Sequence, residues 1–126
     1  MKINVNIQDK SLMRYNSCGD YFYIPFNDTL VFDIADTGND VYNKLILIHE
    51  LVEELLTSQK GIKEEDIMKW DKEHLDSEDP GSIKTAPYHK EHMFAEKIEK
   101  LMAEESQIDW DKYNNYVNKF YKKRLG

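Results

Sequence analysis

Residues 45–56 read LILIHELVEELL, an apolar run that holds one histidine and three glutamates. We expect this run to form a helix, which turns about 100° per residue. The turn places His49 and Glu53 on one face, with Glu50 beside them. The spacing H-E-x-x-E is one residue away from H-E-x-x-H, in which two histidines hold zinc and the glutamate acts as a general base. The stretch therefore predicts a metal-binding helix.

The chain before this helix predicts a small sheet. Lys2–Gln8 alternates apolar and polar residues with the period of two that is typical of a half-buried strand. Leu12–Tyr15 and Tyr21–Ile24 are short strand candidates on either side of a turn, and together they predict a hairpin. Leu30–Ala35 is a further strand. We therefore expect residues 1–36 to form a small antiparallel sheet or hairpins.

The rest of the chain, residues 40–124, predicts three to four helices. Asp40 is the expected N-cap of the first, which runs from about Val41 to Gln59. The others are expected at Glu64–His74, from Tyr88 to about Glu105, and after the capping residue Asp109, with a surface loop at Asp76–Pro87. The predicted fold class is α+β, in a single domain that spans residues 1–126.

Helical periodicity also predicts which side chains pack inward. The expected apolar stripe of the first long helix consists of Val41, Leu45, Ile48, Val52, Leu55 and Leu56. The expected packing face of the helix after Tyr88 consists of Phe94, Ala95, Ile98, Leu101 and Met102. Trp110, Tyr113, Val117 and Phe120 share one face of the last helix.

Composition excludes several classes of protein. The formal net charge of −7 argues against nucleic-acid binding, which needs a clustered basic face. The single cysteine, Cys18, cannot form an intramolecular disulfide, and no run of 18 apolar residues is present to span a membrane. We therefore expect a cytoplasmic protein that binds neither nucleic acid nor membrane, and the oligomeric state stays open.

The third metal ligand is expected from the helix that follows Tyr88. His89, His92 and Glu96 recur on one side of that helix, and His92 lies nearest its apolar face. We therefore rank His92 first, His89 second and Glu96 third as partners of His49 and Glu53. Three such ligands leave the fourth zinc position for water, whose proton Glu50 would accept as general base.

Other residues are weaker candidates for the same site. Asp71 and His74 could orient a ligand or join a second metal. The hydroxyl of Tyr88, one turn before His92, could polarise a bound oxyanion. Cys18 has no neighbouring base in the sequence, so a nucleophilic role is not expected.

The chain resembles a largely uncharacterised family of small bacteriophage and prophage proteins. The residues that carry this likeness are Gly19-Asp20, IHELVEELL at 48–56, Gly61-Ile62, Ile67, Trp70-Asp71, the AP-Y-H-x-x-H block at 86–92, Ala95-Glu96, Ile98-Glu99 and Asp109-Trp110. The chain is also similar to zincin-type metallopeptidases, in which a small sheet with an edge strand precedes the H-E-x-x-H helix. Glu53 stands where that motif has its second histidine, and its charge would weaken the Lewis acidity of the metal.

Three functions therefore stay open. The first is a zinc-dependent hydrolase of the metallopeptidase type, with a peptide as the substrate that the resemblance implies. The second is a Mg²⁺- or Mn²⁺-dependent enzyme, because Glu50-x-x-Glu53 and Glu96-x-x-Glu99 resemble the paired motifs of MazG-type nucleotide pyrophosphohydrolases. The third is a non-enzymatic phage accessory protein in which a metal joins two helices.

Overall fold

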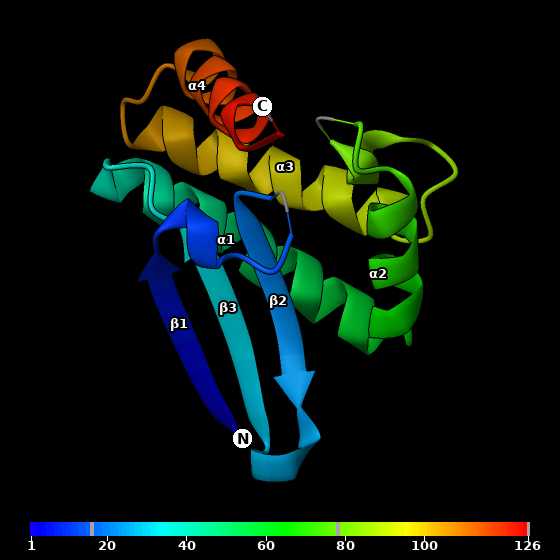
Figure 1. The fold of residues 1–126 in the computed structure, drawn as a ribbon. Helices are drawn as coiled ribbons and strands as arrows, with labels where there is room; N and C mark the ends of the chain where they lie inside the picture. The colour runs from blue at the N-terminus through cyan, green and yellow to red at the C-terminus, as the bar shows by residue number, and fades with distance from the viewer. Residues whose placement is uncertain (16, 78, 126) are drawn as a thin grey trace.

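The computed structural model describes residues 1–15, 17–77 and 79–125, with side chains to residue 120 (Figure 1). A three-stranded sheet comes first and four α-helices follow, so the predicted α+β class is confirmed. The strands are β1 (Lys2–Gln8), β2 (Gly19–Ile24) and β3 (Thr29–Ala35). The helices are α1 (Asp40–Gln59), α2 (Glu64–Glu73), α3 (His89–Glu105) and α4 (Trp110–Leu125). Short 3₁₀ helices occupy Lys10–Leu12 (η1), Pro25–Asn27 (η2) and Pro80–Ser82 (η3).

The sheet has the strand order β1-β3-β2, with β3 in the centre. β2 and β3 are antiparallel, as predicted, but β1 runs parallel to β3. The expectation of a purely antiparallel sheet is wrong for β1, because the chain reverses in β2 before β3 returns beside β1. The hairpin expected between Leu12–Tyr15 and Tyr21–Ile24 is also wrong, since Leu12 ends η1.

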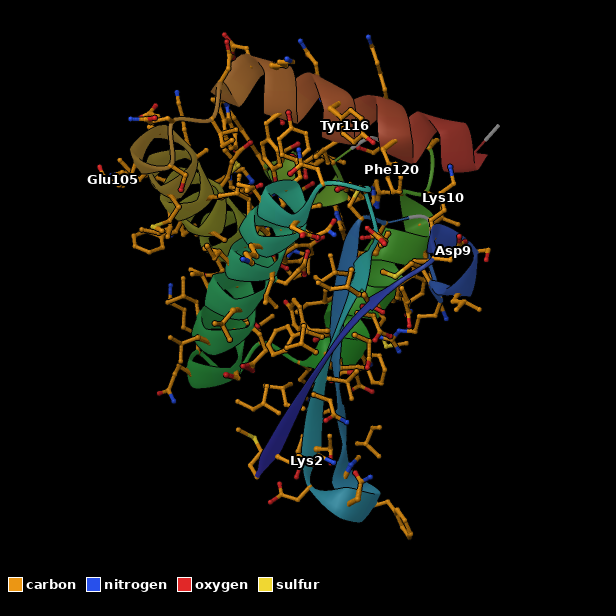
Figure 2. All side chains as sticks on the ribbon, turned by 90° about the vertical axis from the view of Figure 1, so that its left-hand side faces the viewer. Lys2, Asp9, Lys10, Glu105, Tyr116 and Phe120 are labelled. Carbon is orange, nitrogen blue, oxygen red and sulfur yellow. The ribbon has the colours of Figure 1, made fainter. Side chains whose placement is uncertain are left out.

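The helices lie on one side of the sheet. α1 packs on β2 and β3 with one side and on α3 with the other, so it lies between the sheet and α3 (Figure 2). The buried apolar cluster joins these layers and consists of Ile34, Leu45, Ile46, Ala103 and Tyr113. None of the described helices combines the length and the apolar character needed to cross a membrane.

The helix starts follow local capping chemistry. Asn39, not Asp40, is the N-cap of α1, because its Oδ1 accepts hydrogen bonds from the amides of Val41 (3.0 Å) and Tyr42 (3.1 Å). The prediction was therefore one residue late. At α4 the expected cap is confirmed, since Oδ1 of Asp109 accepts a hydrogen bond from the amide of Lys112 at 3.0 Å.

Two predicted packing faces are only partly correct, since Leu45 and Ala95 are buried as expected but other members are not. Phe94 and Leu101 of α3 are 49% and 52% exposed, and Leu55 of α1 is 55% exposed. Besides apolar residues, the buried faces carry polar side chains: Asn43, His49, Glu53 and Thr57 on α1, and Glu91 and Glu99 on α3. The periodicity argument assumed that apolar residues face inward. Here hydrogen bonds and ion pairs satisfy the polar groups, which allows them to be buried between the helices.

Candidate metal centre

Three side chains that could bind a metal converge between α1 and α3. Oε2 of Glu53 lies 3.1 Å from Nε2 of His49 and 2.8 Å from Nδ1 of His92. The two imidazole nitrogens are 3.1 Å apart. Ligand atoms at zinc distances of about 2.0–2.1 Å in a tetrahedral site lie roughly 3.3 Å from one another. The three atoms are therefore spaced much as zinc ligands are.

Helix geometry and one close backbone approach bring these residues together. His49 and Glu53 are one turn apart on α1, and His92 comes from α3, which packs along α1. Gly81 of η3 lies directly against the His92 ring, where a Cβ would be only 2.5 Å from Cγ of His92. A glycine here lets the turn approach the ring closely, so any larger residue would displace His92.

Each imidazole has a carboxylate on its far side. Nδ1 of His49 donates a hydrogen bond to Oε1 of Glu99 at 2.8 Å, and Nε2 of His92 donates one to Oδ1 of Asp79 at 2.7 Å. These carboxylates fix the nitrogen that carries a proton and direct the other nitrogen of each ring toward Glu53. Histidines that bind metals in proteins typically have such a carboxylate partner.

Two tyrosines complete the outer layer of partners. The hydroxyl of Tyr21, on β2, donates to Oε1 of Glu53 at 2.9 Å. The hydroxyl of Tyr113, on α4, donates to Oε2 of Glu99. The site is therefore held by groups from the sheet, from three helices and from the loop before α3.

Charge is densely packed at this centre. Burial opposes the charge of both imidazoles, but hydrogen bonds to carboxylates outweigh it and raise the pKa of His92 to about 10 and that of His49 well above its usual value. Burial would raise the pKa of Glu53, but its hydrogen bonds with the two histidines lower that pKa to about 2. Without a metal, two imidazolium groups therefore face one carboxylate oxygen with their nitrogens 3.1 Å apart. A single divalent cation that replaced the two facing protons would remove this repulsion between the imidazolium groups.

A cavity of about 190 Å³ opens beside the three residues. Glu50 lines it, and the Glu50 side chain lies against Gly19 of β2, where a Cβ would be 2.6 Å from Cγ of Glu50. Burial, and then the negative charge of Glu53, raise the pKa of Glu50 well above its usual value. Among the described residues its carboxylate has no hydrogen-bond partner. Glu50 is therefore placed to accept a proton inside the cavity.

The other sequence candidates lie in different places. His89 is not part of the cluster, because its Nδ1 lies 3.0 Å from the carbonyl oxygen of Gly81. His74 stacks on the ring of Trp70, with ring centroids 3.8 Å apart, and therefore also lies outside it. Glu96 lines the cavity but is not one of the three converging residues.

Tyr88 and Asp71 form a pair on the cavity wall. The Tyr88 hydroxyl donates a hydrogen bond to Oδ1 of Asp71, and the Tyr88 ring meets that of His92 edge-on, with centroids 6.0 Å apart. Burial raises the pKa of Asp71 to about 6, although the hydrogen bond from Tyr88 opposes this shift. The oxyanion role expected for Tyr88 would require this hydroxyl to leave Asp71.

Sequence reasoning missed several residues of the site. Asp79 lies in a loop without periodicity, and Tyr21 and Tyr113 occur in elements whose pattern indicated only packing. Glu99 was expected only as part of a Mg²⁺ motif. The one available signal was that Glu99 and His92 are seven residues apart, which places them on one face of a helix.

Comparison with known proteins adds no relative. No model of a known protein family matches the chain, no curated protein matches its sequence, and no solved structure matches its fold. The functional argument therefore rests on the residues and the geometry described above.

Proposed function

We propose that the protein is a zinc-dependent hydrolase, with His49, Glu53 and His92 as the protein ligands and Glu50 as the general base. The observation that carries the proposal is the pair of carboxylates behind the two imidazoles, at 2.8 and 2.7 Å. Two buried imidazolium groups would use the same acceptors, but a metal site requires them, because each histidine must present one unprotonated nitrogen in a fixed direction.

The donor set favours zinc over magnesium or manganese. Two imidazole nitrogens and one carboxylate suit zinc, whereas Mg²⁺ prefers oxygen ligands and keeps several waters. Glu53 and Glu99, which the pyrophosphohydrolase alternative would use for Mg²⁺, both have an imidazole as hydrogen-bond partner. The zinc reading therefore accounts for more of the observed contacts.

The position of Glu50 favours catalysis over a purely structural metal. Bound zinc would lower the pKa of a water molecule toward neutrality. Glu50 lines the same cavity as His49 and Glu53, and burial raises its pKa, which makes its carboxylate a stronger base than an exposed glutamate. A structural site typically has four protein ligands, whereas only three side chains converge in the described part of the chain. The remaining coordination position would be left for water.

Elemental analysis and zinc titration test the metal part of the proposal. Protein purified without a histidine tag should bind one zinc per chain, and His49→Ala and His92→Ala should each abolish that binding. His89→Ala is the matched control, because His89 is on the same helix but faces Gly81, and it should keep full zinc binding. Wild-type protein that takes up no zinc when it is supplied would refute the proposal.

A second variant separates catalysis from binding. Glu50→Gln should keep stoichiometric zinc but lose cleavage of a fluorogenic peptide library by at least about 100-fold, the typical contribution of a general base. Equal activity in Glu50→Gln and wild type, or none in either with zinc bound, would leave a metal site but contradict the hydrolase assignment.

A further inference from the structure

We propose that two copies of this chain pair through β1, so that their sheets join into one continuous sheet across a two-fold axis at Val5. β1 is the outer strand of the sheet, and Figure 1 shows no helix or strand beyond it. The inference is independent of the candidate metal centre, which lies between α1 and α3, next to β2 at the opposite edge of the sheet.

The backbone of β1 presents an unused edge. The amide of Lys2 donates to the carbonyl of Asp28, and the carbonyl of Gln8 accepts from the amide of Asp36, so the even-numbered residues face β3. Alternation along the strand then directs the N–H and C=O groups of Ile3, Val5 and Ile7 outward. No described residue pairs with that edge. An unpaired edge of this kind is a template for another strand.

The opposite edge of the sheet is protected, and the contrast is informative. On β2 the outward amide of Tyr23 donates to Oε2 of Glu64 at 3.1 Å, so α2 covers part of that edge. Proteins commonly protect sheet edges with charged residues, prolines or covering segments. β1 has one charged residue, Lys2 at its first position, and no proline. It therefore lacks the usual protection against strand pairing.

The sequence of β1 is complementary to itself in the antiparallel direction. With Val5 opposite Val5 of the second copy, Ile3 faces Ile7, and Asn4 faces Asn6. Lys2 then faces Gln8, so no like charges oppose one another. Each pair of outward residues can exchange two backbone hydrogen bonds. A one-residue shift would direct apolar side chains to the polar face, and among the remaining registers only this one pairs all seven residues of β1.

Apolar side chains beside this edge lack cover. Ile3, Val5 and Ile7 are 52%, 44% and 48% exposed, and they lie on the helix-bearing face of the sheet, since they pair with Leu30, Phe32 and Ile34 of β3. α1 and α3 lie beside β1 on the same side of the molecule (Figure 2). Both helices carry exposed apolar side chains, namely Leu51 and Leu55 on α1 and Phe94 and Leu101 on α3.

The strand edge and the helices beside it together set the size of the proposed interface. At about half exposure each, Ile3, Val5 and Ile7 offer on the order of 250 Å² of apolar surface per protomer. A standard interface buries about 800 Å² per partner, so the paired backbone of β1 and the exposed surface of α1 and α3 would supply the remainder.

The mass in solution tests the proposal. Sedimentation or light scattering over a concentration series should give twice the chain mass of 15.0 kDa for wild type, and one chain mass for Val5→Lys. Tyr23→Lys is the matched control, because Tyr23 is 41% exposed on the opposite edge of the same sheet, and it should remain a dimer. A monomeric wild type, or a dimer that survives Val5→Lys, would overturn the proposal.

A disulfide experiment tests the register. In a Cys18→Ser background, Val5→Cys should form a disulfide-linked dimer under mild oxidation, because directly opposite hydrogen-bonded residues have Cα atoms about 5.5 Å apart. Ile3→Cys alone should not, since its partner would be Ile7, but the double variant Ile3→Cys/Ile7→Cys should. Efficient cross-linking of Ile3→Cys alone would contradict this register. Circular dichroism shows whether each variant is folded.

Discussion

The two faces of α1 differ less in polarity than those of an ordinary surface helix. The inward face carries His49 and Glu53, both buried, while Leu51 and Leu55 on the outward face are about half exposed. A helix normally gains its place by burying an apolar stripe. Here ion pairs and hydrogen bonds between α1 and α3 add to the packing of Leu45 and Ile46, while Leu51 and Leu55 are left outside. The inner face holds the proposed zinc site, and the outer face carries apolar side chains that pack on nothing in the described part of the chain.

The largest expected effect comes from a substitution on the inner face of α1, and it concerns the free energy of unfolding of the metal-free protein. Glu53→Ala removes the carboxylate that both histidines and Tyr21 contact, which should lower the free energy of unfolding by about 3 kcal/mol. Urea unfolding in the presence of a chelator at neutral pH measures this. A loss below that of an ordinary surface substitution would mean that the inner network does not hold α1.

The inner face should also respond to pH. The folded state keeps a proton on His92 up to a pKa of about 10, against 6.5 for a free imidazole, so it binds more protons than the unfolded state between these values. Stability without metal should therefore fall as pH rises through that window. Zinc must displace the protons of two imidazoles, so its apparent affinity should rise by up to about 100-fold per pH unit. Calorimetry in buffers of different ionisation enthalpy counts the released protons, and a pH-independent affinity would contradict the shared site.

A smaller effect is expected from the layer behind the ligands. Glu99→Gln keeps the shape of the side chain but weakens the partner of His49, and should reduce zinc affinity by about 10- to 100-fold. Glu96→Gln is the control, because Glu96 is three residues earlier on α3 and lines the cavity without joining the cluster. Zinc competition with a chromophoric chelator separates the two, and equal affinities would argue against a positioning role for Glu99.

The smallest effect should come from the outer face. Leu55→Gln removes an exposed apolar side chain, and should change the free energy of unfolding by no more than about 0.5 kcal/mol. Val5→Lys is the background of choice for this measurement, because the proposed dimer then makes no contribution. A large loss in that monomeric background would mean that the outer face of α1 packs within the protomer.

Sequence reasoning found what is local and missed what depends on packing. The spacing of His49 and Glu53 follows from helix geometry alone, and their closeness needed no knowledge of the fold. The inward face of α3 could not be predicted, because Phe94 and Leu101 carry the apolar signal while Glu91 and Glu99 are buried. Only the pairing of buried charges across two helices reverses that expectation.

Asp79 and the direction of β1 could not be predicted for the same reason, because both depend on contacts between distant segments. Asp79 meets His92 through a loop whose path has no periodic signature. The alternation in Lys2–Gln8 predicts a strand but not its neighbour, and β1 pairs with a strand more than twenty residues away. Register and direction are set by contacts that no single segment contains.

The hydroxyl of Tyr113 links the candidate metal centre to α4, the helix that is synthesised last. Glu99 positions His49 and is itself held by Tyr113, which belongs to the last helix. A chain still emerging from the ribosome would have His49 and Glu53 in place long before Tyr113 could reach Glu99. The proposed zinc binding should therefore come late in synthesis, after α4 has docked, and a chain truncated before α4 should bind zinc more weakly than the full chain.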